Sequence, residues 1–263
     1  MAEHHALQGE GSAAVAQIRR IEEAAFSSWP APQQVLEDGW LLRFGGGHTK
    51  RANSANPLYG GTGDADKLIG AVERAYRRRG LPVIFRLTPL ADVADFDRRL
   101  EARGYRSVDP SRALVLPDLA GLPRAGIPPG LTLCIDKAPN AAWFAAIDRV
   151  RPIPLAERAA RQRIVAAIAL PAAYAALYDG STAIAVGLAV VSGGWFGVYD
   201  LATDEAWRGR GLMRALISEL GAWARSQGAE AGQLFVVAGN APAERLYQAL
   251  GYRELYRYHY RVG

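Results

Sequence analysis

The feature that most limits what this chain can fold into is the stretch YDLATDEAWRGRGLMRALI, residues 199–217. A strand pattern there leads through a short loop, with glycines at 209 and 211, into a helical pattern. Such a loop presents consecutive backbone N–H groups at a helix N-terminus, where unsatisfied donors and the helix dipole favour an anion. Arg208 and Arg210 add two charged donors. The stretch therefore predicts a phosphate-binding strand, loop and helix.

Two common phosphate motifs do not fit this stretch. The dinucleotide motif needs a third glycine at position 214, which is Arg214, and a parallel βαβ unit around it. The triphosphate loop needs Gly-Lys followed by Ser or Thr, and that triplet occurs nowhere, including the glycine-rich residues 60–67. Nucleotide-binding proteins of these two classes are therefore disfavoured.

The segments around the loop predict a mixed sheet. Alternating or continuous apolar runs predict strands over residues 131–135, 172–179, 182–192 and 195–203, the last three joined by tight turns into an antiparallel meander. Helical periodicity predicts helices over residues 140–150, 155–169, 211–227 and 241–250. Residues 231–238 read as a buried strand, and residues 255–262 alternate as a final one.

The first half of the chain repeats this order in outline. A hairpin (39–44 with 49–55), a helix (64–80) and a strand (82–88) are expected, followed by a stretch over residues 95–107, in which a helix precedes a Gly-Tyr-Arg tripeptide, that leads into a strand (113–116). A shift of 147 residues, from 104 to 251, lays Gly104, Tyr105 and Arg106 on a second Gly-Tyr-Arg. We therefore expect two related halves, each ending in a helix, this tripeptide and a strand.

A proline- and glycine-rich segment separates the halves, and residues 118–130 are predicted to be a linker. The predicted domains are residues 14–117 and 131–263. The fold class is α/β (α+β), with a mixed, largely antiparallel twisted sheet flanked by helices in each domain. The polar stretch TKRANSANPL, residues 49–58, either reaches the cleft or forms a hairpin strand with a solvated face, and the second interpretation is preferred.

Composition removes several classes of function. The net charge of +5 includes a basic run at residues 77–79, which suits the last turn of a solvated helix better than a nucleic-acid surface. The lone Cys134 excludes an internal disulfide and is expected in the core. His48 and His259 stand alone, so no metal is predicted. Without an apolar run of about 18 residues or a secretory signal, a cytoplasmic protein is expected, with no membrane association.

A second motif follows the predicted phosphate loop. It lies in NAPAERLYQALGY, residues 240–252, and consists of Asn240, Ala243, Tyr247 and Gly251 at fixed spacing. This motif is independent of the glycines in the loop. Together, the two motifs resemble the GCN5-related N-acetyltransferases, whose pyrophosphate loop is matched by Arg208, Gly211 and Met213. Met213 departs from the small residue usual at its position. The resemblance covers residues 130–263 in detail and the first half in outline.

The resemblance implies a site that binds acetyl-CoA and an amine acceptor. The strand before the loop is expected to diverge from its neighbour and to bind the pantetheine arm. Tyr247 matches the residue that protonates the departing thiolate, although a tyrosine on a helix can also be a packing residue. Asp200 is the nearest candidate for the base that deprotonates the amine, with a distant carboxylate or no base as alternatives. The implied cofactor-binding residues are Leu201, Ala202, Thr203, Arg208, Gly209, Arg210, Gly211, Leu212, Met213, Asn240, Ala243 and Tyr247.

The repeat indicates which half is active. At the offset of 147, Leu100 stands where Tyr247 does and Val93 where Asn240 does, so the first half resembles a degenerate acetyltransferase domain. It is expected to shape the acceptor pocket or to hold the halves together. The predicted activity is transfer of an acetyl group from acetyl-CoA to a primary amine by direct attack. The alternatives are a regulatory acyl-CoA-binding protein without catalysis and, less favoured, a nucleic-acid-binding protein. A homodimer is compatible with the pattern, and the acceptor stays open.

Overall fold

The structure is a computed structural model that describes residues 2–61 and 63–263, with the side chains of the first helix described from residue 13 onward. Its α-helices are α1 (Ala2–Ser28), α2 (Ala65–Arg77), α3 (Val93–Ala102), α4 (Ala141–Val150), α5 (Leu155–Ala166), α6 (Leu212–Ser226) and α7 (Ala241–Ala249). Its strands are β1 (Gln33–Glu37), β2 (Trp40–Phe44), β3 (Ala55–Pro57), β4 (Ile84–Leu87), β5 (Arg106–Leu116), β6 (Leu131–Asp136), β7 (Ala172–Asp179), β8 (Thr182–Ser192), β9 (Trp195–Thr203), β10 (Ala231–Val237) and β11 (Arg253–Val262). Three short 3₁₀ helices cover Lys50–Ala52, Leu119–Gly121 and Glu205–Trp207.

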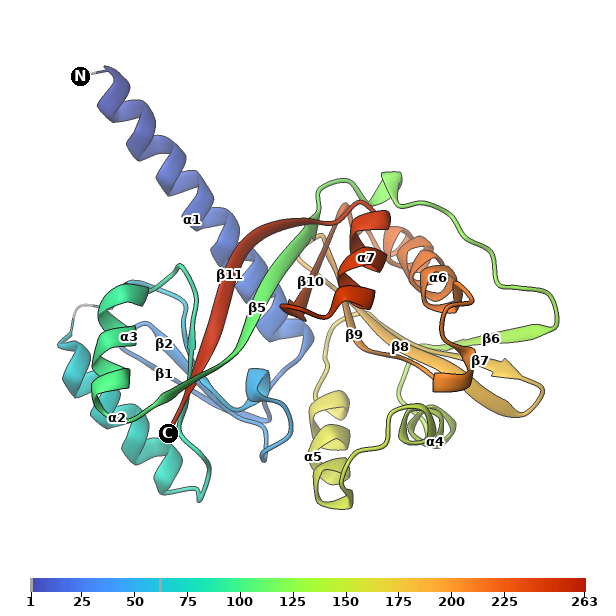
Figure 1. The fold of residues 1–263 in the computed structure, drawn as a ribbon, viewed down its shortest axis with the longest axis horizontal. Coiled ribbons are helices and arrows are strands. Elements are labelled where there is room, and N and C mark those ends of the chain that lie inside the picture. The colour runs from blue at the N-terminus through green and yellow to red at the C-terminus, as the bar shows by residue number, and fades with distance from the viewer. Residues whose placement is uncertain (1, 62) are drawn as a thin grey trace.

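The strands form a continuous mixed sheet in the order β1-β2-β3-β4-β11-β5-β10-β9-β8-β7-β6. The predicted antiparallel meander is confirmed by the pairing of β7 with β8 and of β8 with β9. Along β7, Ala173, Ala175 and Leu177 enter the core beneath α6, while the alternate residues enter a second core beneath α4 and α5. Because both faces of these strands are covered (Figure 1), their sequences read as continuous apolar runs rather than as alternating ones.

The two halves exchange their last strands. The C-terminal strand β11 pairs with β4 of the first half, and β5 of the first half pairs with β10 of the second. The exchanged strands also pair with each other, antiparallel, in the middle of the sheet. Arg253 faces Val115 and Val262 faces Arg106, and the same offset of 147 residues relates one pair to the other. A pseudo-twofold axis therefore passes through the β5–β11 ladder, and the halves cannot be separated without breaking it.

The repeated Gly-Tyr pairs lie at equivalent places. Gly104 follows α3 with a φ of 82°, and Gly251 follows α7 with a φ of 89°; this left-handed region favours glycine. Each tyrosine after them, Tyr105 and Tyr252, is buried at the start of an exchanged strand. The tripeptide therefore marks the turn from the last helix of each half into the strand that it exchanges.

Helix α1 was not predicted from the sequence, yet it lies across the junction between the halves (Figure 1). Its Ile21 is fully buried, and so is Glu22, whose carboxylate accepts hydrogen bonds from the guanidinium of Arg86 on β4 and from the hydroxyl of Tyr256 on β11. Since β4 and β11 come from different halves, one buried carboxylate holds α1 to both of them.

Two local predictions were wrong. The predicted strand over residues 49–55 is mostly a 3₁₀ helix at Lys50–Ala52, and pairing with β2 begins only at Ala55. Cys134 is exposed, because β6 is the edge strand of the sheet and does not lie in the core. Among the described helices, none combines the length and apolar character that crossing a membrane requires.

Candidate active site

Strands β9 and β10 begin side by side and then diverge. They pair in parallel only from Trp195 with Ala231 to Gly197 with Gln233, while β9 continues its pairing with β8 as far as Thr203. The backbone groups of β9 beyond Gly197 that face β10 therefore have no ladder partner there. Two cavities occupy this opening.

The first, which we call the loop cavity, has a volume of about 590 Å³ and lies against the start of α6. Gly209 and Gly211 both have a φ of 75°, which glycine adopts without strain. No side chain caps α6 at Gly211, so the first N–H groups of this helix remain available to a ligand. An anion such as a pyrophosphate fits this position electrostatically.

All but one of the residues predicted to bind the cofactor line the loop cavity. The exception is Arg210, whose guanidinium stacks over the Trp207 ring at 4.5 Å and donates to the carbonyl of Ala206 at 3.2 Å. Arg208 pairs with Glu205 at 3.2 Å through side chains that are mostly exposed. The lining residues from the prediction are Leu201, Ala202, Thr203, Arg208, Gly209, Gly211, Leu212, Met213, Asn240, Ala243 and Tyr247.

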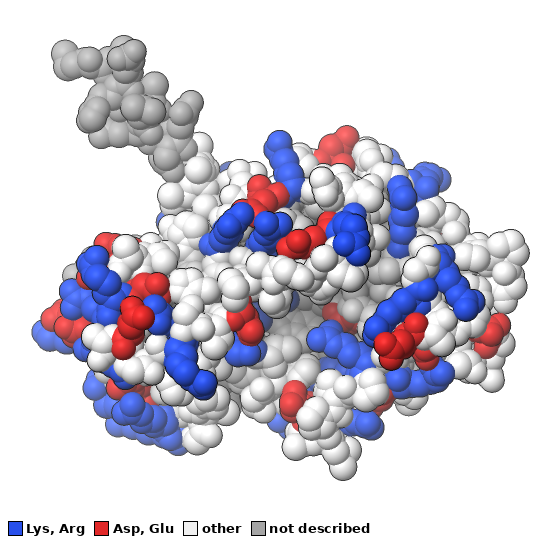
Figure 2. Space-filling model, viewed as in Figure 1, with Lys and Arg blue, Asp and Glu red and all other residues white. Residues whose placement is uncertain are grey.

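The second cavity, called the inner cavity, has a volume of about 430 Å³ and lies between the two halves. The space-filling view is hollowed between the lobes on this face, with basic side chains near the hollow (Figure 2). Both cavities share part of their walls, so they meet at one junction. The shared residues are Arg151, Leu201, Asn240, Ala243 and Tyr247.

Tyr247 stands at this junction. Its ring packs edge to face against Tyr252 at 6.0 Å, while no residue in the described part of the chain hydrogen-bonds its hydroxyl. Burial raises the pKa of Tyr247 to about 12, so the phenol keeps its proton at neutral pH. Asn240 accepts a hydrogen bond from the N–H of Ala243 at 3.3 Å and thereby caps α7. The cap fixes the start of the helix that carries Tyr247.

Asp200 lies on β9, in the wall of the inner cavity, at a bulge. The β8–β9 register slips between Val186 and Leu188, and Asp200 adopts a φ of 48°, which is uncommon for a residue with a side chain. A bulge turns the local side chains away from the normal alternation of the strand. Opposite it, a Cβ at Gly187 would come within 2.8 Å of Leu201, so glycine makes room for the bulge.

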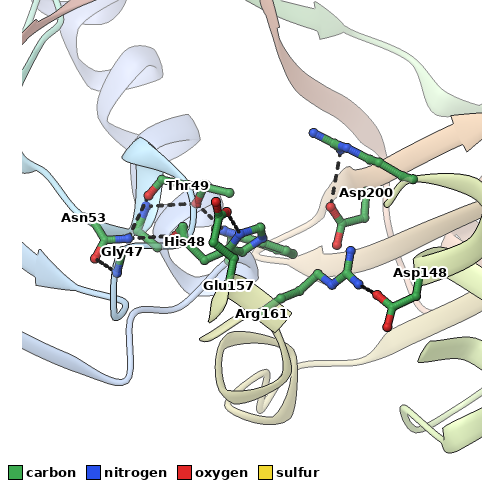
Figure 3. A network of polar contacts seen from close by, with 11 residues as sticks. Gly47, His48, Thr49, Asn53, Asp148, Glu157, Arg161 and Asp200 are labelled. Carbon is green, nitrogen blue, oxygen red and sulfur yellow. Dashed lines mark hydrogen bonds and ion pairs between the residues drawn. The ribbon is translucent and has the colours of Figure 1, made fainter. Parts of the chain in front are cut away.

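The Asp200 side chain is only 8% exposed, and its Oδ2 atom has no hydrogen-bond partner among the described residues. Its Oδ1 atom lies 3.5 Å from the guanidinium of Arg151 (Figure 3). Burial raises the pKa of the Asp200 carboxyl above its usual value, although the charges of Arg151 and Arg161 act in the opposite direction. The free oxygen and the raised pKa suit a group that accepts a proton.

A polar network from the first half and α5 supports this side of the site (Figure 3). The Asn53 side chain accepts from the N–H of Gly47 and donates to the carbonyls of His48 and Thr49, which holds the turn before the 3₁₀ helix. His48 pairs through Nδ1 with Glu157 at 3.1 Å. His259 similarly pairs with Asp97 at 2.8 Å, so neither histidine stands alone. The described residues contain no group of three or more metal-binding side chains.

The preferred interpretation of residues 49–58 was wrong. This segment carries buried Asn53, Ser54 and Asn56, and its Lys50 and Arg51 line the inner cavity. Sequence reasoning also missed Trp29 at the end of α1 and Asp109 on β5 as cavity residues. The polar run in an expected strand was the available signal, because polar residues in a buried strand need a partner or a ligand. Tyr256, Tyr258 and Tyr260 on β11 are buried, and Tyr258 and Tyr260 also line the inner cavity.

Comparison with known proteins places this site in context. Residues 15–261 match the family described as "Probable histone acetyltransferase Rv0428c C-terminal". The chain is 28% identical over 249 residues to the Bacillus subtilis protein named "Uncharacterized N-acetyltransferase YobR", an alignment that covers 93% of this chain and 98% of that protein.

Solved structures share the fold. A GCN5-related N-acetyltransferase from Kribbella flavida superposes with a TM-score of 0.65 at 17% identity, over 93% of this chain and 94% of that one. A tandem GNAT protein from the clavulanic acid biosynthesis pathway superposes with a TM-score of 0.66 at 13% identity, over 92% of this chain and 87% of that one. At these identities the likeness concerns the fold.

Proposed function

The chain belongs to the Rv0428c C-terminal family of GCN5-related N-acetyltransferases, and from that premise we propose that it transfers an acetyl group from acetyl-CoA to a primary amine. The observation that supports this best is the placement of Tyr247 at the junction of two cavities, with Asp200 in the wall of the inner one. The loop cavity takes the donor, and the inner cavity takes the acceptor.

The donor side follows from the loop cavity. The N–H groups around Gly209 and Gly211 would hold the pyrophosphate of acetyl-CoA, and Arg208 adds charge at the rim. The pantetheine arm would pair with the unmatched backbone of β9 from Leu201 to Thr203, much as an added strand pairs with a sheet edge. This arrangement brings the thioester to the junction near Tyr247.

The chemistry then needs two proton movements. Asp200 takes a proton from the ammonium of the acceptor, and the neutral amine attacks the thioester carbonyl. The new C–N bond forms as the C–S bond breaks, and the Tyr247 hydroxyl transfers its proton to the departing sulfur, so coenzyme A leaves as a thiol. The second proton of the nitrogen passes through solvent to the Tyr247 oxygen, and Asp200 releases the first proton to solvent, which restores both groups. A phenol whose pKa is about 12 stays protonated, and so it is a donor at every turnover.

The two halves divide the work in this proposal. Residues 131–263 bind the donor, whereas residues 14–117 form the acceptor wall through Lys50, Arg51 and Asp109. A regulatory acyl-CoA binder would have no use for a buried carboxylate and an unpartnered phenol at the thioester position. Membership of an acetyltransferase family also favours the enzyme.

The direct test is thiol release from acetyl-CoA, followed with a thiol reagent, in the presence of a panel of primary amines. We expect acetyl-CoA to bind without an acceptor and thiol to be released only when an amine is added. Mass spectrometry of the product should show one added acetyl group on nitrogen. Binding of acetyl-CoA without turnover on any amine would contradict the proposal and favour the regulatory alternative.

Asp200→Asn should lower kcat/KM at neutral pH by about 100-fold, within the range of general-base effects. In the wild type, kcat/KM should rise with pH as Asp200 loses its proton, with a midpoint above the usual aspartate pKa of about 3.9, because burial raises the pKa. The variant should lose this rise. If Asp200→Asn showed the same dependence of kcat/KM on pH as the wild type, Asp200 would not be the base.

Asp200→Asn should lower the activity without lowering the free energy of unfolding. An acid whose pKa is raised by folding binds more protons in the folded state, so its stabilising contribution is lost as pH rises through the raised pKa. Ionised Asp200 therefore costs stability at neutral pH. Urea unfolding at pH 7 should find Asp200→Asn at least as stable as the wild type, which separates its loss of activity from misfolding.

A further inference from the structure

Resting on the proposed acetyl transfer, we infer that the acceptor is a small amine that also carries a carboxylate, as a free amino acid does, and that Arg51 binds this carboxylate. The inference comes from the charges of the inner cavity, whose walls carry a cation without an acidic partner, Arg51, and a partly partnered anion, Asp200.

The charged groups of the inner cavity do not balance. Its walls hold three basic side chains, Lys50, Arg51 and Arg151, and two acidic ones, Asp109 and Asp200. Lys50 pairs with Asp109 at 2.7 Å, and Arg151 lies 3.5 Å from Asp200. Arg51 is left without an acidic partner among the residues that the structure describes.

The surroundings of Arg51 leave its guanidinium N–H groups without directed hydrogen bonds to the described residues. Its guanidinium lies over the rings of Phe235 at 5.0 Å and Tyr199 at 5.9 Å, and its Nε atom is buried without a hydrogen-bond partner. Aromatic faces attract a cation, but they accept none of the directed N–H bonds that a guanidinium offers. A carboxylate matches that planar set of donors in a bidentate manner. The missing partner is therefore an anionic group of the ligand.

Arg51 is held in place for such a role. Its carbonyl accepts a hydrogen bond of 2.8 Å from Arg43, a buried arginine that also donates to the carbonyls of Phe26 and Trp29 at the end of α1. The backbone of the 3₁₀ helix is thus tied to α1. Two further donors face the same space, since no described residue hydrogen-bonds the hydroxyl of Tyr258 or Tyr260, and both side chains line the cavity.

Asp200 then receives the amine. Its buried, unpartnered Oδ2 suits an ammonium group, and Tyr247 marks the proposed position of the thioester. An amine and a carboxylate on one small molecule would pair with both Asp200 and Arg51 in a cavity of about 430 Å³. A lysine- and arginine-rich tail, the substrate suggested by the words "histone acetyltransferase" in the family description, would bring further cations to a cavity that already has an unpaired one.

The test compares three classes of acceptor with the wild-type enzyme, namely free amino acids, the same amino acids as carboxamides, and a basic histone-tail peptide. We expect at least one amino acid to show a kcat/KM about 10- to 100-fold above that of its amide, the range for losing a hydrogen bond to a charged group. Equal use of amino acid and amide, or preference for the basic peptide, would overturn this inference while leaving acetyl transfer established. No thiol release with any amine would overturn the proposed function and this inference with it.

Arg51→Met then tests whether Arg51 binds the carboxylate of the acceptor. This variant should lose the same 10- to 100-fold advantage of the amino acid while keeping the rate for the amide and the KM for acetyl-CoA. Arg98→Met, which removes an arginine of α3 whose side chain is 73% exposed, is the matched control and should change neither rate. Equal losses for amino acid and amide in Arg51→Met would contradict the assignment. The wild-type comparison still decides the acceptor class if the variant is unstable.

Discussion

Tyr247→Phe should lower kcat by about 1,000-fold, because it removes the hydroxyl at the junction that is proposed to protonate the departing sulfur. The affinity for acetyl-CoA should stay within a few-fold of the wild type, since the phenyl ring preserves the packing against Tyr252. Single-turnover measurements of thiol release, with acetyl-CoA affinity from calorimetry, separate these two quantities.

The neighbouring tyrosine supplies a matched control. Tyr252→Phe removes a hydroxyl of the same kind, buried without a hydrogen-bond partner, from a ring that lines neither cavity. It should leave kcat unchanged. If Tyr247→Phe also kept kcat within about fivefold, well below the usual general-acid contribution, Tyr247 would be a packing residue and the sulfur would leave without its help.

Glu22→Leu should destabilise the protein by about 3–5 kcal/mol, the usual cost of leaving one member of a buried ion pair alone. Glu22 is fully buried and Arg86 is 1% exposed, so the remaining guanidinium cannot reach water. Tyr256 also loses the acceptor of its hydroxyl. For a chain of this size, such a loss corresponds to a fall in Tm of about 10 °C, measurable by calorimetry or urea unfolding.

The double variant Glu22→Leu, Arg86→Met tests whether the loss comes from the stranded charge. Replacing both members of a buried pair with apolar groups is often close to neutral, so the double variant should be more stable than Glu22→Leu alone. A single variant within about 1 kcal/mol of the wild type would show that the pair does not hold α1 to the sheet. Because Trp29, the residue that follows α1, lines the inner cavity, Glu22→Leu should raise the KM for the acceptor more than that for acetyl-CoA.

The exchange of β5 and β11 has a consequence for the site. Asp109 on β5 and Tyr258 on β11 face one cavity only because each strand crosses into the other half. The inner cavity therefore depends on both halves being folded together. In the proposed function, the first half can lack donor-binding residues, as Leu100 and Val93 indicate, and still shape the site of the acceptor.

Much of the loop cavity could be predicted from the sequence because its signals are local. The strand, loop and helix of residues 199–217 and the helix that carries Tyr247 depend on periodicity, glycine conformation and capping within a few residues. The two glycines with positive φ and the cap at Asn240 are where those rules place them. Neighbouring residues determine such features, so a single sequence contains them.

The inner cavity and the helix beside it depend on contacts that no local pattern contains. The sequence around Glu22 does not show that this carboxylate is buried, and only its partners on β4 and β11 explain its burial. The pattern of residues 49–58 alone indicates a solvated strand, because nothing nearby shows that Arg51 meets the rings of Tyr199 and Phe235.

The sequence by itself determined the elements of the second half, its antiparallel meander, the repeat at an offset of 147 residues and the residues around the phosphate loop, since these follow from neighbouring side chains and backbone preferences. Only the tertiary structure decided the place of α1, how the strands of the two halves pair, that the last strands are exchanged, and that Arg51 and Asp200 line one cavity. Strand pairing and charge pairing join residues far apart in the chain, and their free energy exists only once the whole sheet has formed.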